Sequence, residues 1–413
     1  MKRPAAKRRT VTAENLASLG RARLAEILVE VAATRPDLKR RLRMELAAEH
    51  GPSSLAPEID KRLASLETSR GKITWRQRPA FIRDLDALAR LIADRLAPMD
   101  ADAAIERLWR MIDTAKGVGA RYRARGDELD AVFGRAAQDL GRLLKGVSPH
   151  LAATALVESL VKNPLGWKMW LPGLLSETSA DMSREALRFL RERSAASPGW
   201  VNLVRLLSDA AGDVETYAST FTADARATAP VAAGIARRLL AAGRVDAAGE
   251  LLRQAADGVR RTAKVDEDWE SVWIDYLDLA GREDEAQAVR WASFERTLMP
   301  QRARAFIARL ADFDDVEAEA RAFAIASQFP RFATGLAFLM EWPALPEASG
   351  MIEARADEIE VSDEEAELWA AKLRRRYPRA ALLLLRKAAA AALRRRDFKA
   401  SDRLTAEADT IDA

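Results

Sequence analysis

The feature that most constrains the fold is a short phrase that occurs twice. Ala-Gly-Arg-Val-Asp-Ala-Ala occupies residues 242–248, and Ala-Gly-Arg-Glu-Asp-Glu-Ala occupies residues 280–286. An apolar stretch with helical spacing precedes each copy, and an amphipathic stretch follows it. Gly243 and Gly281 can adopt the left-handed conformation that ends a helix, and Asp246 and Asp284 can cap the first turn of the next helix. This arrangement predicts stacked helical hairpins.

The composition favours an all-α fold and excludes several kinds of site. Strong helix formers are abundant and β-branched runs are nearly absent, so we expect about 70% helix. The chain has no cysteine, which excludes disulfides, thiolate zinc sites and cysteine nucleophiles and fits a cytoplasmic protein. With only two histidines, histidine-rich metal sites are excluded as well. No apolar run reaches roughly 18 residues, so we expect no membrane span.

The pattern of breaks along the chain predicts three regions. We expect a basic disordered tail over residues 1–11, a helical region over 12–147 and a solenoid of helical hairpins over 148–413. The second boundary is placed at Gly146-Val147-Ser148-Pro149, because glycine and proline interrupt the helical pattern there. Lys116-Gly117-Val118-Gly119 has no preceding strand and no P-loop Lys-Ser/Thr, so we interpret it as a turn and not as a phosphate cradle.

The positive charge is concentrated at the N-terminus. Residues 1–43 contain 12 Lys/Arg and 4 Asp/Glu, whereas the whole chain has a net charge of only +4. The remainder of the chain is therefore slightly acidic, and a nucleic-acid surface along the whole protein is not implied. If a polyanion binds anywhere, we expect contacts at Lys39, Arg40 and Arg41.

The repeated units resemble tetratricopeptide repeats. The intervals from Gly212 to Gly243 and from Gly243 to Gly281 are 31 and 38 residues, near that family's period of about 34. Ile274 departs from the pattern, which has a small residue there. Small residues stand at the matching helix-contact positions Ala236, Ala248 and Ala255 in the first repeat, Ala286 and Ser293 in the second repeat, and Ala389, Ser401 and Ala408 in a degenerate C-terminal repeat. The resemblance implies a tetratricopeptide-like α-solenoid.

The N-terminal part resembles a different group. The segments 14–20, 38–46 and 82–88 are similar to an uncharacterised family of long, all-helical proteobacterial proteins, a domain of unknown function. This resemblance implies an all-helical fold and a bacterial source. It implies no functional residues.

No cluster of residues in the sequence assembles a catalytic site. Ser362-Asp363-Glu364-Glu365 predicts a capping box at a helix start. His50 and His150 lie beside glycine or proline without a recognisable nucleophile nearby. We therefore expect no enzyme activity, no cofactor and no metal site.

The candidate partner-binding residues are aromatic. Trp269, Trp273 and Tyr276 share one helical stripe. Such a stripe either fills the core between hairpins or lies partly exposed on a concave groove, where Trp and Tyr anchor peptides or helices. We expect a noncatalytic scaffold or protein-binding protein with a protein or peptide partner. The alternatives are a nucleic-acid-associated or regulatory protein that uses the basic arm, and an enzyme on a helical repeat fold. The oligomeric state does not follow from the sequence.

Overall fold

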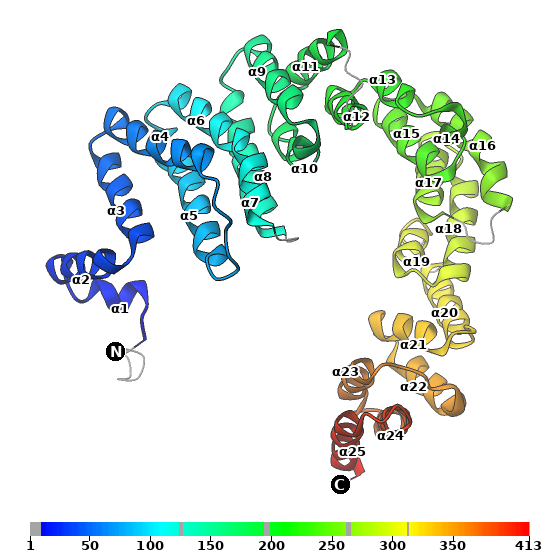
Figure 1. The fold of residues 1–413 in the computed structure, drawn as a ribbon. Coiled ribbons are helices and arrows are strands. Elements are labelled where there is room, and N and C mark those ends of the chain that lie inside the picture. Colours follow the sequence, from blue (N-terminus) through cyan, green and yellow to red (C-terminus); the bar gives the residue numbers. More distant parts are fainter. Residues whose placement is uncertain (1–9, 124–126, 194–198, 262–265, 312–313, 413) are drawn as a thin grey trace. The chain divides into compact units, whose positions relative to one another are not determined.

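The computed structural model describes residues 10–123, 127–193, 199–261, 266–311 and 314–412. Within these ranges every regular element is a helix and no strand occurs (Figure 1). The predicted all-α class is therefore confirmed. The chain divides into two compact units, Met1–Ala242 and Gly243–Ala413. Residues 1–9 of the expected basic tail lie outside the described residues.

The first unit consists of helices joined by short connections, and a π-helical turn at Leu91–Leu96 follows α5. Its α-helices are α1 (Ala13–Ala17), α2 (Arg21–Thr34), α3 (Pro36–Glu49), α4 (Pro52–Thr68), α5 (Arg78–Arg90), α6 (Ala101–Asp113), α7 (Ala115–Tyr122), α8 (Asp127–Leu144), α9 (Pro149–Lys162), α10 (Pro164–Leu175), α11 (Ala180–Glu192), α12 (Trp200–Ala211), α13 (Val214–Ser219), α14 (Ala223–Arg226) and α15 (Ala229–Ala241).

The second unit continues the same construction, and a 3-10 turn at Ala356–Glu358 follows α22. Its α-helices are α16 (Val245–Arg261), α17 (Glu267–Leu279), α18 (Glu283–Thr297), α19 (Pro300–Ile307), α20 (Asp314–Ser327), α21 (Phe332–Glu341), α22 (Leu345–Ala354), α23 (Asp363–Leu373), α24 (Pro378–Arg394) and α25 (Phe398–Asp412). Consecutive helices such as α17 and α18, or α24 and α25, pack against each other, as expected for a helical repeat.

Local sequence signals explain where many of these helices begin and end. Proline occupies the first position of α3, α4, α9, α10 and α24, where its missing N–H costs no hydrogen bond. Gly281 has φ +71° after α17, and the N–H of Arg282 donates to the carbonyl of Leu277 at 2.9 Å. Gly212 has φ +70° after α12, and the N–H of Asp213 donates in the same way to Ser208 at 2.9 Å. The predicted glycine turns are therefore left-handed helix ends.

The aspartates that follow these turns do not cap the next helices as expected. Asp246 and Asp284 already lie within the first turns of α16 and α18. The residue that flanks α18 is Arg282, and its side chain makes no capping hydrogen bond. A carboxylate within the first turn is still favourable there, because it faces the positive end of the helix dipole.

The glycine pair at 117 and 119 does not form a turn. Residues 115–122 form α7, and the left-handed residue that ends this helix is Arg123, with φ +48°. Val118 and Tyr122 of α7 are buried in the core of the first unit. Their burial offsets the cost of two helical glycines, which is about 1 kcal/mol each relative to alanine.

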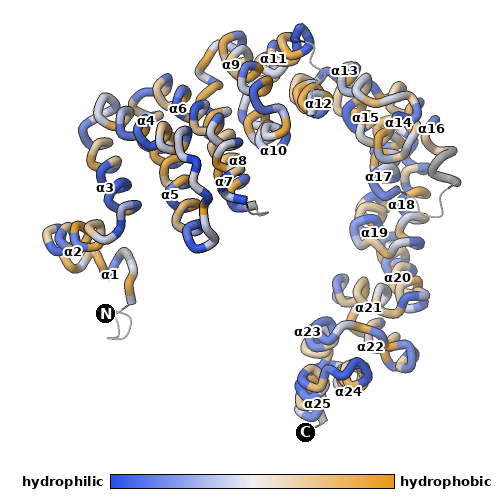
Figure 2. Tube along the Cα trace, in the orientation of Figure 1, coloured by the Kyte–Doolittle hydropathy of each residue, from blue (hydrophilic) through white to orange (hydrophobic). Residues whose placement is uncertain are grey.

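The core of the first unit does not stop at the predicted boundary between residues 147 and 148. Buried side chains form one cluster from Met44 to Leu207, with Leu144 and Ala152 on either side of that position. Phe133 of α8 packs against Trp170 of α10 with ring centroids 5.5 Å apart. Glycine and proline mark only a local break, because α8 and α10 then pack together across it. Along most helices hydrophobic and hydrophilic residues alternate (Figure 2), as expected when one face of a helix is buried.

The positions at which the resemblance places small residues are all buried. Ala248, Ala255 and Ala286 are fully inaccessible, and Ser293 is 1% exposed. Ala236 in the first unit and Ala389, Ser401 and Ala408 near the C-terminus are buried too. Ile274, the larger residue, is also buried.

Candidate functional site

The three aromatic residues predicted to share a stripe lie side by side on α17. The rings of Trp269 and Trp273 are stacked, with centroids 5.5 Å apart and planes inclined by 7°. The ring of Trp273 lies 5.2 Å from that of Tyr276 between centroids. Spacings of four and three residues bring side chains to one face of a helix. Asp266 caps this helix by accepting the N–H of Trp269 at 2.8 Å.

The three rings differ in exposure, and this decides between the two interpretations of the stripe. Trp269 is 8% exposed and Tyr276 is 6% exposed, so both belong to the interior. The indole Nε1 of Trp269 is buried without a hydrogen-bond acceptor in the described part of the chain. Trp273 is only partly buried. The core interpretation therefore holds for Trp269 and Tyr276, and of the three rings only that of Trp273 is partly exposed.

Helix α16 fixes the position of Tyr276. The hydroxyl of Tyr276 accepts a hydrogen bond from Nη1 of Arg253 at 2.9 Å. The ring lies directly over Gly249, where a Cβ would come within 2.7 Å of Oη and closer still to two ring carbons. The missing side chain at Gly249 therefore makes room for the ring, which in turn supports Trp273.

Polar contacts that the sequence did not reveal join α17 to α18. Glu270 is 6% exposed, and its carboxylate accepts from Oγ of Ser293 at 2.5 Å and from Nη2 of Arg296 at 2.6 Å. Arg290, 2% exposed, is paired with Asp278. Charge-assisted hydrogen bonds of this kind hold the two helices in one register. The helix that carries Trp273 is therefore rigidly positioned.

A pocket of about 640 Å³ opens near the end of α17. Asp278 faces it with Arg290, and Arg309 lies 3.6 Å from the same carboxylate. Glu283 and Asp284 also line the pocket and are exposed. The two arginines neutralise Asp278, so the carboxylates left for a ligand are those of Glu283 and Asp284. These could accept a basic side chain.

The three candidate polyanion residues do not form one surface. Lys39 and Arg41 on α3 are exposed. Arg40 instead points toward α5, where its Nε lies 3.4 Å from the carboxylate of Asp84. Arg62 binds the same carboxylate at 2.5 Å, and burial lowers the pKa of Arg62. An arginine that is engaged in a partly buried ion pair is less available to a polyanion.

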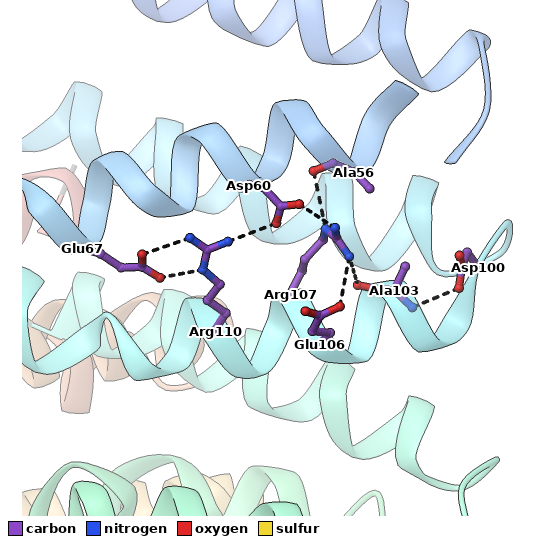
Figure 3. A network of polar contacts seen from close by, with 8 residues as sticks. All are labelled: Ala56, Asp60, Glu67, Asp100, Ala103, Glu106, Arg107 and Arg110. Carbon is purple, nitrogen blue, oxygen red and sulfur yellow. Dashed lines mark hydrogen bonds and ion pairs between the residues drawn. The ribbon is translucent and has the colours of Figure 1, made fainter. Parts of the chain in front are cut away.

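A denser polar network joins α4 to α6 (Figure 3). Arg107 donates to Asp60 at 2.6 Å, and Arg110 bridges Asp60 and Glu67 at 3.2 and 2.6 Å. The hydrogen bond from Arg110 lowers the pKa of Glu67. Because each carboxylate already has an arginine partner, the network serves to clamp two helices together.

None of the described helices is long and apolar enough to cross a bilayer.

Comparison with known proteins gives a family for the chain. The model of the family of unknown function DUF6880 matches residues 6–201 and again residues 200–412. The search of curated proteins found no match. Since the two matched segments span nearly the whole chain, the protein belongs to this family of unknown function, DUF6880.

Proposed function

We propose that the protein is a noncatalytic, cytoplasmic scaffold that binds a protein or peptide partner through the face of α17. The observation that carries the proposal is the environment of Trp273. Its ring is held between those of Trp269 and Tyr276, yet it is only partly buried. Tryptophan is among the residue types that most often dominate the binding energy of an interface.

The support for Trp273 also favours binding. Gly249 and Arg253 position Tyr276, and the Glu270 contacts fix α17 against α18. A ring that is already ordered loses little conformational entropy when a partner covers it, and preorganisation of this kind raises affinity. A cytoplasmic location is part of the proposal, because a chain without cysteine has no need of an oxidising compartment.

The test is a paired measurement on Trp273→Ala. Peptides are selected from a random displayed library with the full-length wild-type chain, and their affinity for the variant is then measured. We expect Trp273→Ala to weaken binding by about 2 kcal/mol. Its effect on the free energy of unfolding, derived from thermal melts, should be smaller than its effect on the free energy of binding.

Trp342→Ala is the matched control. Trp342 is also partly buried in the second unit, but its ring packs against Phe338 at 5.2 Å and its indole N–H donates to Glu319. We expect this change to lower the melting temperature and to leave peptide affinity unchanged. If selected peptides bind the Trp273 variant as tightly as the wild type, or if both variants lose binding in proportion to stability, the proposal fails.

A further inference from the structure

Two basic segments of the chain contain no acidic residue, and no pattern in the sequence connects them. Residues 68–83 contain five Lys/Arg, residues 114–126 contain four, and neither segment contains Asp or Glu. The first segment comprises the connection between α4 and α5 and the beginning of α5, and the second comprises α7 and the residues after it. Residues 84–113, 30 in all, separate them, so no local pattern relates one to the other.

The structure brings these two segments together. The N–H of Ile73 donates to the carbonyl of Arg121 at 3.1 Å, and Nε of Arg121 donates to the carbonyl of Gly71 at 2.9 Å. The guanidinium of Arg78 lies 5.2 Å from the centre of the Tyr122 ring. These contacts join residues 70–78 and 121–123 into one surface of the first unit. We call it the Trp75 surface, and its side chains are those of Arg70, Lys72, Trp75, Arg76, Arg78, Arg121 and Arg123.

The cations of the Trp75 surface lack the carboxylate partners that arginines have elsewhere in the unit. In the described ranges none of them forms an ion pair with Asp or Glu. Arg70 donates to the carbonyl of Glu67 and Arg123 to that of Ala120. Arg78 Nε and Arg121 Nη1 are buried without an acceptor among the residues that the structure describes. Two acids beside this surface are already engaged: Glu67 binds Arg110, and Glu128 accepts from Tyr122. The surface therefore has unneutralised positive charge.

An exposed aromatic ring lies among these cations. Trp75 is 70% exposed, and the guanidinium of Arg76 lies 5.1 Å from its ring centre. A cationic surface with an exposed ring is suited to single-stranded nucleic acid, because the phosphates meet the cations and an unpaired base stacks on the ring. A membrane surface fits less well. Binding to a membrane would need further apolar side chains that insert into it. The neighbouring Ile73 is buried and therefore does not insert.

The geometry points to a single-stranded nucleic-acid binding site on the Trp75 surface, formed by residues 70–78 and 121–123. This site is separate from the peptide surface proposed on α17, since it lies in the other unit and uses different residues. It also differs from the contacts at Lys39, Arg40 and Arg41 that the sequence favoured.

The experiment is fluorescence anisotropy of the full chain with labelled oligo-dT and oligo-rU. Oligonucleotides of about 20 nucleotides are long enough to span one binding site. A duplex of the same length serves for comparison. We expect the single strands to bind more tightly than the duplex, with an affinity that falls as salt rises. Trp75→Ala should raise the Kd about tenfold, and Trp75→Phe should restore most of the affinity.

Charge variants complete the test. Lys72→Glu with Arg76→Glu should abolish binding, whereas the matched pair Lys39→Glu with Arg41→Glu removes the same charge and should leave the Kd within about twofold. Circular dichroism of each variant confirms folding, since these side chains are exposed. The inference is overturned if the wild type does not bind the oligonucleotides at low salt, or if the Lys39/Arg41 pair weakens binding equally. It is also overturned if the wild type binds phosphatidylglycerol vesicles and Trp75→Ala weakens only that binding.

Discussion

At the scale of single residues, Gly249 and Tyr276 show how one missing side chain shapes the candidate site. Gly249 lies inside α16 and is buried beneath the Tyr276 ring. That ring contacts Trp273, the partly exposed residue of the stripe. The sequence repeat drew attention to Ala248 as the small residue of this turn of α16, but the Tyr276 ring of α17 lies directly over its neighbour Gly249.

We therefore expect Gly249→Ala to destabilise the second unit by about 1–3 kcal/mol, because the new methyl group overlaps a ring that cannot move freely. Gly350→Ala is the control. Gly350 is exposed inside α22, and a Cβ there meets nothing within 4 Å. This change should stabilise the helix by about 0.5–1 kcal/mol. Thermal unfolding of both variants measures these effects. Melting-temperature shifts of the same sign in both would contradict the contact assigned to Gly249.

At the scale of secondary-structure elements, α23 begins as its sequence predicts. Oγ of Ser362 accepts the N–H of Glu365 at 3.2 Å, and the Glu365 carboxylate accepts the N–H of Ser362 at 3.1 Å. The predicted capping box is thus confirmed. It satisfies two backbone donors at the helix start that have no partner within the helix.

Loss of the Ser362 hydroxyl should loosen the start of α23. We expect Ser362→Ala to cost about 1 kcal/mol, which corresponds to about fivefold faster amide exchange in the first turn. Hydrogen–deuterium exchange with mass spectrometry on peptides from α23 measures this. Ser362→Thr keeps the acceptor oxygen and should exchange at nearly the wild-type rate. Equal exchange in both variants would mean that the box adds nothing to the helix.

At the scale of the whole molecule, the described residues form two hydrophobic cores. One cluster of buried residues runs from Met44 to Leu207 and another from Trp291 to Ala408. The division between units at residues 242 and 243 lies between these clusters. A division at residues 147 and 148 would instead cut the first cluster, where α8 packs on α10. Close contact there is clear at Gly141, where a Cβ would meet the carbonyl of Leu174.

Two cuts of the chain distinguish these divisions. Residues 1–242 and 243–413 expressed separately should each be helical and unfold cooperatively, because each retains its own core. Residues 1–147 should aggregate or unfold without a transition, since removal of α10 exposes the apolar face of α8 to water. Circular dichroism melts and size-exclusion chromatography test this. A monomeric, cooperatively folded 1–147 fragment would restore the boundary that the sequence favoured.

The sequence alone determined the features that depend on neighbouring residues. Helical periodicity, proline at helix starts, the glycine turn at residue 281 and the capping box at Ser362 are local, because each is set by hydrogen bonds and torsion angles within a few residues. For the same reason the sequence placed Trp269, Trp273 and Tyr276 on one stripe. The helix at residues 115–122 was missed, since the buried contacts of Val118 and Tyr122 override the low helix propensity of two glycines.

Only the tertiary structure decided which helix lies against which. That choice buries Trp269 and Tyr276 but leaves Trp273 partly exposed, and it turns Arg40 toward Asp84. It also makes the core continuous past residue 147 and joins residues 70–78 and 121–123 into one surface. The physical reason is that burial and ion pairing depend on side chains brought together from distant parts of the chain, which no pattern within one helix specifies.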